Sequence, residues 1–393
     1  MPRITSRVSK LPLYAVGALA ARKRELVARG VDLIDLGAGD ADLAPPPAAV
    51  EALVHGARVP ALQRYGFGVG YYPYREAIAA FMQRRFGLTF DPATEVVPLI
   101  GSKEGIAHCA LAFLEHGDVA VVPEPGYICY AGGTLLADAD VHAYALRADQ
   151  NFLLELSDVP PDVLARTRLL YLNYPNNPTG AIAPRDYLER VVRTCRDRDI
   201  LLVYDNAYSE LAFDGYVPPS IFEIPGADEV AIEFHSLSKT YNMTGWRCAW
   251  AVGRPPIAGA LARVKQFIDT GHYMAIQSAG VAALESWESF VPGNVATFQE
   301  RRDAAVAAFR AEGFAVEAPL ATMYLWIPLP AGLPSALFAE RLLEEHGVVV
   351  LPGSSFGDGG EGFVRISFIV PPERLAQAAR HAGQVLRSLE SHV

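Results

Sequence analysis

One lysine stands in a segment whose residue types suit reaction chemistry. Lys239 follows Ser236 and Ser238, comes soon after a mainly apolar run over residues 230–234, and precedes Arg247 by eight residues. An amine that is partly withdrawn from water beside another cation loses some of its proton affinity and can act as a Schiff-base nucleophile. Most lysines are simply solvated, so a reactive lysine requires that other segments supply the rest of a site.

Two glycine turns predict close approach of the backbone to a ligand. An apolar strand over residues 96–100 leads through Gly101 to Ser102 and Lys103, which open a helical pattern. A helix N-terminus presents free N–H groups and a positive dipole end to an anion, although the Walker spacing is absent. Gly39 belongs to a second turn, Gly-Ala-Gly-Asp, after a strand expected at 31–36. A simple turn explains that pattern equally well.

Polar residues at strand ends are the next candidates. Asp205 follows the apolar run 200–204, at the end of a strand where open α/β sheets hold ligands; strand-end capping is the alternative. Asn177 opens Asn-Pro-Thr-Gly, which alone is typical of a turn. Arg365 lies in the middle of an apolar strand, where burial without an acidic partner is costly, but an exposed strand face would also accommodate it.

Aromatic residues complete the set of candidates. Tyr127 stands at the exit of a strand expected over 118–122, where it can cap the core or offer a π-face to a flat ligand. Tyr65 lies in a glycine-rich loop, and Tyr208 follows Asp205 by three residues. A lone tyrosine such as Tyr65 is more often a packing residue.

These features occur in one order along the chain, and together they resemble a known family. Ser-x-Ser-Lys followed by Gly-x-Arg, with Asn-Pro-Thr-Gly upstream, is similar to the class I/II aminotransferases that use pyridoxal 5'-phosphate (PLP) and share the aspartate-aminotransferase fold type I. The resemblance extends from about Leu11 to the C-terminal helix. It implies an α/β fold: a doubly wound, mostly parallel sheet of the seven-stranded type and a smaller α+β domain from the chain ends. We expect residues 1–45 to form an N-terminal arm and part of the small domain, 46–290 the large PLP-binding domain, and 291–393 the small C-terminal domain.

The resemblance implies roles for the catalytic residues. Lys239 would bind the cofactor and then carry a proton between the substrate Cα and the cofactor. Asp205 would keep the ring nitrogen of the cofactor protonated, and Tyr208 would hydrogen-bond its phenolic oxygen. Asn177 would bind the same oxygen and contact the substrate, and Arg365 would clamp the substrate α-carboxylate with its planar fork.

The other roles concern binding. The resemblance implies phosphate contacts from Gly101, Ser102, Lys103, Ser236, Ser238 and Arg247. Tyr127 would stack on the cofactor ring, and Gly39 would lie across the substrate. Tyr65 would reach the cofactor phosphate of a neighbouring subunit, which predicts a homodimer with shared active sites.

Substrate specificity is less sharply indicated. The segments around Lys103, Lys239 and Ile268 look like the branch that contains LL-diaminopimelate and alanine aminotransferases. We therefore expect glutamate and 2-oxoglutarate as one substrate pair, with diaminopimelate, alanine or aspartate as the second amino acid. Two segments, Gly70–Tyr74 and His272–Met274, depart from that branch. An altered substrate pocket and repacking at a dimer interface are both compatible with the departures.

Three other functions were weighed against aminotransfer. A PLP-dependent C–S β-lyase would use the same Lys239, so only its products would distinguish it. A regulatory binding protein would carry an added DNA-binding domain or lack the lysine. A nucleotide-binding α/β enzyme would need a Gly-x-Gly-x-x-Gly or Walker motif, and the sequence has neither.

Composition limits the partners and the compartment. A net charge of −10 argues against nucleic acid or an anionic membrane as a partner. The four cysteines form no Cys-x-x-Cys pair, so neither a metal site nor a disulfide framework is predicted, and a reducing cytoplasm is expected. Basic residues before the apolar run 11–21 allow a signal peptide, but Pro12 and the helical continuation favour a helix. No run approaches the ~20 apolar residues of a membrane span.

Overall fold

The computed structural model describes residues 2–11, 15–40, 42–67 and 70–390. Its centre is a seven-stranded sheet in the order β2-β8-β7-β6-β5-β3-β4. The strands are β2 (Val96–Ile100), β3 (Val119–Glu124), β4 (Asp140–Ala145), β5 (Thr167–Leu172), β6 (Leu201–Asp205), β7 (Ala231–Ser236) and β8 (Cys248–Gly253). Only β8 runs antiparallel to its neighbours. The expected mostly parallel sheet is therefore confirmed.

Helices cover both faces of this sheet, because its central strands are apolar on both sides. One face packs on α8 (Arg185–Asp197), whose buried side chains fall at helical spacing. The other face packs on α5 (Ser102–Phe113), α6 (Cys129–Leu136) and α11 (Pro255–Gln266). The carboxyl ends of the parallel strands are left open for a ligand, as expected for a doubly wound sheet.

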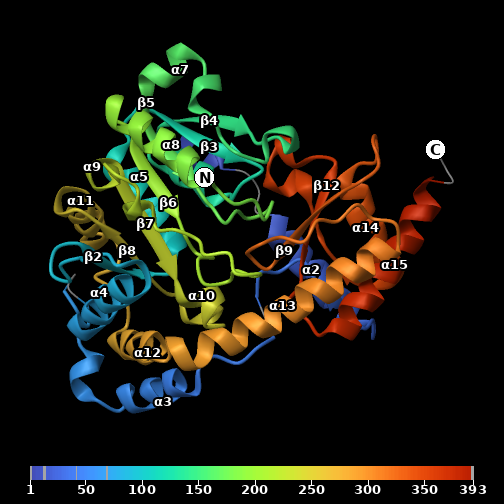
Figure 1. Cartoon of the computed structure of the whole chain (residues 1–393), viewed down its shortest axis with the longest axis horizontal. Helices are drawn as coiled ribbons and strands as arrows, with labels where there is room; N and C mark the ends of the chain where they lie inside the picture. Colours follow the sequence, from blue (N-terminus) through green and yellow to red (C-terminus); the bar gives the residue numbers. More distant parts are fainter. Residues whose placement is uncertain (1, 12–14, 41, 68–69, 391–393) are drawn as a thin grey trace.

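A second, smaller region contains the C-terminal end of the described chain (Figure 1), whereas the N-terminal helix α1 (Ser6–Lys10) contacts α6 of the large region. Its three-stranded sheet has the order β11-β12-β9, with β9 (Tyr324–Pro328), β11 (Leu351–Pro352) and β12 (Phe363–Ser367). Helices α14 (Ser335–His346) and α15 (Pro372–Glu390) pack against it. The early strand β1 (Ile34–Asp35) pairs with β10 (Val348–Val349), and Figure 1 shows α2 (Ala15–Ala28) among these late elements.

One long helix joins the two regions. Helix α13 (Trp287–Ala311) runs from α12 (Met274–Glu285) to α15 (Figure 1) and continues through residues 290–291, where we expected a domain boundary. Helices α3 (Pro47–Gly56) and α4 (Tyr72–Phe86) pack with α12 at the far end of the large region. The short helices are α1 (Ser6–Lys10), α7 (Pro161–Arg166), α9 (Ala227–Val230) and α10 (Leu237–Thr240).

The expected elements match the observed ones with local shifts. The strand predicted over 31–36 is limited to Ile34–Asp35, because its partner β10 is only two residues long. The helix expected from Arg75 begins three residues earlier, with Pro73 in its first turn, where the missing N–H costs nothing. The beginning of the helix expected from Leu13 lies outside the described residues. Across the described ranges, no helix is both long and apolar enough to cross a membrane.

Candidate active site

A cavity of about 380 Å³ lies where the carboxyl ends of the large sheet meet the small region. Both regions and helix α2 contribute side chains to its wall. The predicted site residues that line it are Gly39, Ser102, Lys103, Tyr127, Asn177, Asp205, Tyr208, Ser236, Ser238, Lys239, Arg247 and Arg365. The fold thus gathers into one cavity all of the predicted residues except Gly101 and Tyr65.

Asp205 places a buried carboxylate at the end of β6. Its Oδ2 accepts a hydrogen bond from the Tyr130 hydroxyl at 2.8 Å, whereas Oδ1 has no hydrogen-bond partner among the described residues. Burial raises the pKa of this carboxyl to about 6, although the Tyr130 hydrogen bond and the nearby His235 act in the opposite direction. A buried acceptor at the wall of a cavity suits a ligand that carries an N–H donor.

Gly101 and Arg247 form a cationic cradle at the start of α5. Gly101 has a φ of +74°, and a Cβ at this position would collide with Nη2 of Arg247. The glycine therefore lets the guanidinium lie over the helix N-terminus. Arg247 is anchored by a 2.8 Å hydrogen bond from Nη1 to the Thr244 carbonyl, and Ser236 Oγ accepts the Ser238 N–H at 3.1 Å. Helix dipole, guanidinium and hydroxyl groups together fit a phosphate.

Lys239 lies on the short helix α10, and its Nζ donates a hydrogen bond to the Gly39 carbonyl. A Cβ at Gly39 would overlap the Tyr324 hydroxyl and lie 3.1 Å from Nζ of Lys239. Only a glycine leaves enough space here for the lysine and the tyrosine. The Gly39 backbone thus comes close to the candidate reactive lysine, and its expected approach to a substrate stays a prediction.

Arg365 is buried on β12, so the alternative of an exposed strand face is wrong. Its Nη1 donates to Asn177 Oδ1 at 2.8 Å, and its Nη2 donates to the Gly37 carbonyl at 2.5 Å. The rings of Tyr324 and Phe356 lie 4.2 Å and 5.0 Å from the guanidinium. A guanidinium at the wall of a cavity suits a carboxylate ligand, because its planar fork matches the two carboxylate oxygens.

Tyr127 forms an aromatic wall beside Asp205. Its ring meets the Tyr130 ring edge to face at 5.7 Å, and Nζ of Lys103 lies 5.8 Å from its centroid. Tyr130 in turn carries the hydroxyl that binds Asp205. A flat, cationic ring placed against Tyr127 would find the free carboxylate oxygen in reach of its edge.

The sequence model of the aminotransferase class I and II family matches residues 31–381. The chain belongs to this family. It is 44% identical to the LL-diaminopimelate aminotransferase of Moorella thermoacetica and 45% identical to that of Desulforudis audaxviator, with 98% and 95% of both chains covered. The solved structure of substrate-bound BacF from Bacillus subtilis superimposes with a TM-score of 0.94 at 34% identity and covers 98% of both chains.

Membership confirms the fold and the chemistry expected from the sequence. The chain is a PLP-dependent aminotransferase of fold type I, which moves an amino group between an amino acid and a 2-oxo acid. The C–S lyase alternative is not favoured, because the curated relatives are aminotransferases. Asp205, the Gly101 cradle and Tyr127 fit the ring nitrogen, phosphate and ring face of PLP.

Two residues that line the aminotransferase cavity, Asn173 and Tyr324, and one that binds Asp205 from behind it, Tyr130, were not singled out by the sequence. Asn173 links two predicted residues: its Nδ2 donates to the Asp205 carbonyl at 2.7 Å, and its Oδ1 accepts the Asn177 N–H at 2.8 Å. The Tyr130 hydroxyl donates a hydrogen bond to Asp205, and the Tyr324 hydroxyl lies beside Gly39, as does Nζ of Lys239. Asn173 lies four residues before Asn177 and Tyr130 three residues after Tyr127, so both stand next to residues that the sequence did single out. Tyr324 lies on an ordinary apolar strand and reaches the cavity only through the fold.

The two segments that depart from the aminotransferase branch lie away from the cavity. Tyr74 is fully buried and accepts a hydrogen bond from Cys248 Sγ at 3.3 Å, whereas Tyr72 and Tyr273 are about 40% exposed. His272 is buried, and burial lowers its pKa to about 4. None of these residues lines the cavity of this chain within the described ranges. An altered pocket made by these residues would therefore have to be that of a partner subunit, and repacking at a dimer interface remains the other explanation.

Proposed function

We propose that this cavity is the active site and that the enzyme transfers an amino group from LL-diaminopimelate to 2-oxoglutarate. The assembly of Lys239, Asp205 and Arg365 around one cavity carries the assignment of the site. The substrate rests on the names of relatives that are 44–45% identical over nearly the whole chain.

PLP, when bound, supplies an electron-withdrawing ring that accepts the electron pair left when the substrate Cα loses its proton. Asp205 Oδ1 would hold the ring nitrogen in its protonated form. The N-terminus of α5 with Ser102, Ser236, Ser238 and Arg247 would hold the phosphate. Tyr208 and Asn177 would hold the phenolic oxygen.

Lys239 moves the proton. Its amine reaches the cavity from α10 beside the Gly39 carbonyl, which supports a role next to a bound substrate. It would accept the proton from the substrate Cα as a general base and return it to the C4′ carbon of the cofactor as a general acid. Arg365 holds the α-carboxylate in two parallel hydrogen bonds and thereby fixes which Cα bond faces Lys239.

An ion pair in the cavity wall suits the second end of diaminopimelate. Nζ of Lys23 on α2 pairs with Asp35 Oδ2, and both residues line the cavity. Asp35 Oδ1 also accepts the Gly37 N–H at 3.0 Å, and the Gly37 carbonyl accepts from Arg365. The carboxylate of Asp35 and the ammonium of Lys23 thus lie in the cavity wall close to Arg365, the proposed carboxylate clamp. They match the ammonium and carboxylate groups at the distal end of this substrate.

The deciding experiment is a spectral titration of the purified holoenzyme with a panel of amino acids. We expect glutamate and LL-diaminopimelate to convert the bound cofactor to its amino form.

Lys239→Ala should abolish turnover and the absorbance band of lysine-bound cofactor; retained transamination would refute the assignment of Lys239. Arg365→Lys should weaken the binding of every amino acid, because the bidentate fork is lost. Conversion by glutamate and alanine or aspartate, but not by diaminopimelate, would replace the proposed substrate.

A homodimer with shared active sites is also proposed. Tyr65 and Phe67 are 73% and 74% exposed, and their rings lie 5.6 Å apart, so an aromatic pair projects from this chain away from its own cavity. We infer that Tyr65 reaches the cofactor phosphate of the partner. The four cysteines are buried and unpaired, which suits the reducing cytoplasm in which we propose that the enzyme acts.

Complementation tests the shared site. Tyr65→Ala and Lys239→Ala chains should each have low activity, but a mixed dimer would contain one site with both native residues. Co-expression should therefore restore activity well above that of either variant. Activity no higher than the average of the two variants would refute the sharing of Tyr65 between subunits.

A further inference from the structure

Tyr324 is a buried phenol in the cavity that none of the roles above uses. It is the first residue of β9, which pairs with β12 so that Tyr324 lies opposite Ser367, two residues from Arg365. Its backbone N–H donates to Thr322 Oγ1 at 3.2 Å, and its side chain is buried. Strand pairing and burial therefore hold the phenol in one place.

The hydroxyl of Tyr324 faces the reactive amine. A Cβ at Gly39 would overlap this hydroxyl and lie 3.1 Å from Nζ of Lys239, so both atoms crowd the same point. On its other side, the hydroxyl lies 3.1 Å from the Tyr208 hydroxyl. Lys239 and Tyr324 therefore meet beside Gly39 in the cavity wall, and Tyr208 lies next to Tyr324.

The ring of Tyr324 faces the carboxylate clamp. The guanidinium carbon of Arg365 lies 4.2 Å from the ring centroid, within the range of a cation–π interaction. The hydroxyl of Tyr324 thus lies near Lys239, whereas its ring contacts Arg365. We propose that Tyr324 is a further residue of the reaction: its hydroxyl accepts a hydrogen bond from protonated Lys239, and its ring positions Arg365. The inference rests on the proposed role of Lys239 as the proton carrier.

The charges around the two tyrosines distinguish their roles. Burial alone would raise the pKa of Tyr324, but the positive charges of Lys239 and Arg365 lower it below its ordinary value. Burial and the proximity of Tyr324 raise the pKa of Tyr208 well above its ordinary value, with Asp205 acting in the same direction. Tyr324 is therefore the better acceptor for the Lys239 ammonium, whereas Tyr208 keeps its single proton, which it can donate to the phenolic oxygen of the cofactor.

The proton step balances without another reactant. The Cα–H bond of the substrate breaks, the proton joins Nζ of Lys239, and the electron pair remains with the substrate and cofactor. The new ammonium gains a hydrogen-bond acceptor in the Tyr324 oxygen, so its positive charge is stabilised as it forms. The same contact would retain the proton until Lys239 returns it.

Two variants separate the two roles. Tyr324→Phe removes the hydroxyl and keeps the ring; Tyr324→Leu removes both. We expect Tyr324→Phe to lower kcat about 10- to 100-fold with KM for glutamate unchanged. It should also raise the isotope effect with α-deuterated glutamate, because proton removal becomes slower. Tyr324→Leu should show the same loss and raise KM a further ~3- to 30-fold, because Arg365 loses its aromatic support.

A measurement without turnover provides an independent check. The holoenzyme is titrated with acid and base, and the pH midpoint of the cofactor absorbance change is recorded. Tyr324→Phe should move this midpoint down by about one pH unit, because the positive charge at the lysine nitrogen loses an acceptor. Tyr187→Phe is the matched control: it removes a buried hydroxyl that donates to the Leu154 carbonyl at 2.8 Å, far from the cavity. It should leave midpoint, kcat and isotope effect unchanged.

The outcomes separate this inference from the proposed function. An unchanged midpoint, kcat and isotope effect in Tyr324→Phe, with the native protein active and Lys239→Ala inactive, would overturn the role of the hydroxyl. Equal KM values for the Phe and Leu variants would overturn the role of the ring. A native protein without a lysine-dependent absorbance band would instead refute the assignment of Lys239, on which the inference rests.

Discussion

Two buried carboxylates on neighbouring strands differ in what surrounds them. Glu233 on β7 is fully buried, and both of its oxygens are paired: Oε1 accepts from Asn206 Nδ2 at 2.7 Å and lies 3.1 Å from His235 Nε2, and Oε2 accepts from Ser220 Oγ. Asp205 on β6 has one paired oxygen and one that faces the cavity. Burial is common to both residues, so unused hydrogen-bonding capacity is what distinguishes the ligand site.

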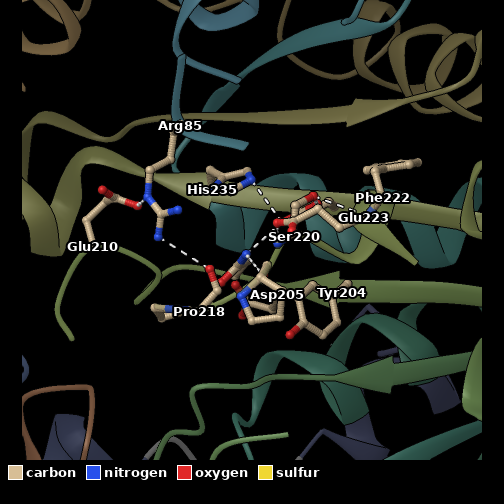
Figure 2. Close-up of polar contacts among 12 residues, drawn as sticks. Arg85, Tyr204, Asp205, Glu210, Pro218, Ser220, Phe222, Glu223 and His235 are labelled. Carbon is tan, nitrogen blue, oxygen red and sulfur yellow. Dashed lines mark hydrogen bonds and ion pairs between the residues drawn. The ribbon is translucent and has the colours of Figure 1, made fainter. Parts of the chain in front are cut away.

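A third carboxylate supports the comparison. Glu210 Oε1 accepts from Arg85 Nε at 2.8 Å, and its Oε2 accepts from Trp287 Nε1 at 2.7 Å. Figure 2 shows Arg85 between Glu210 and Pro218, with Ser220 and His235 nearby. Here again each carboxylate oxygen has a protein partner. We therefore expect Glu210 and Glu233 to stabilise the fold, whereas the unpaired oxygen of Asp205 supports its proposed role in binding a ligand.

The largest expected effect is the loss of a fully paired carboxylate. Glu233→Ala removes the acceptor for Asn206 Nδ2 and Ser220 Oγ and leaves these groups buried without it. We expect the free energy of unfolding to fall by about 3–5 kcal/mol, the range for breaking a buried charged network. Urea unfolding of the cofactor-free protein measures the change.

A matched substitution tests whether hydrogen bonding is the cause. Glu233→Gln keeps the shape and one carbonyl acceptor, so it should cost clearly less than Glu233→Ala. Equal losses for the two variants would show that packing volume, rather than pairing, makes this carboxylate structural.

Asp205→Asn should have the opposite sign. Because burial raises the pKa of Asp205 from 3.8 to about 6, the ionised form destabilises the cofactor-free fold at pH 7. A shift of this size corresponds to about 3 kcal/mol. The asparagine variant should therefore be more stable than the native protein at pH 7 when the cofactor is removed, and should hold the cofactor less tightly when it is present.

The pH dependence gives the decisive signature. In the native protein the penalty is absent below the unfolded-state pKa of 3.8, grows as the pH rises, and is complete above about 6. The gain from Asp205→Asn should accordingly disappear near pH 4. A gain that is constant from pH 4 to 7, or a loss at pH 7, would show that Asp205 is not a strained carboxylate.

The sequence indicated which residue types could carry the chemistry of the site. It did not indicate that one of them, Asp205, is buried with a raised pKa. Lys239, Asp205 and Arg365 stand in segments whose order resembles one family, and the fold places all three in one cavity. The apolar runs also predicted the central sheet, because strands buried on both faces have few polar residues. Apolar runs of this kind can be recognised from the sequence because they depend only on residues that are close together in the chain.

What the sequence left out depends on contacts between distant segments. Tyr324 reaches Lys239 only because β9 pairs with β12 and the small region closes on the large one. The unfilled oxygen of Asp205 depends on how Tyr130 and Asn173 arrange their hydrogen bonds around it. Neither of these features has a short sequence motif.

The smallest expected effect comes from a carboxylate that is paired but exposed. Glu344 accepts from Arg22 Nε at 2.7 Å, and the two side chains are 38% and 33% exposed. Water replaces a lost partner at such a site and screens the charges, so Glu344→Gln should change the free energy of unfolding by less than about 1 kcal/mol. Added salt should reduce the difference further. Urea unfolding at low and high salt, alongside Glu233→Gln, measures both effects. A loss as large as that of Glu233→Ala would mean that a paired carboxylate stabilises this fold equally well when it is exposed. Burial would then contribute nothing to the stabilising effect of Glu233.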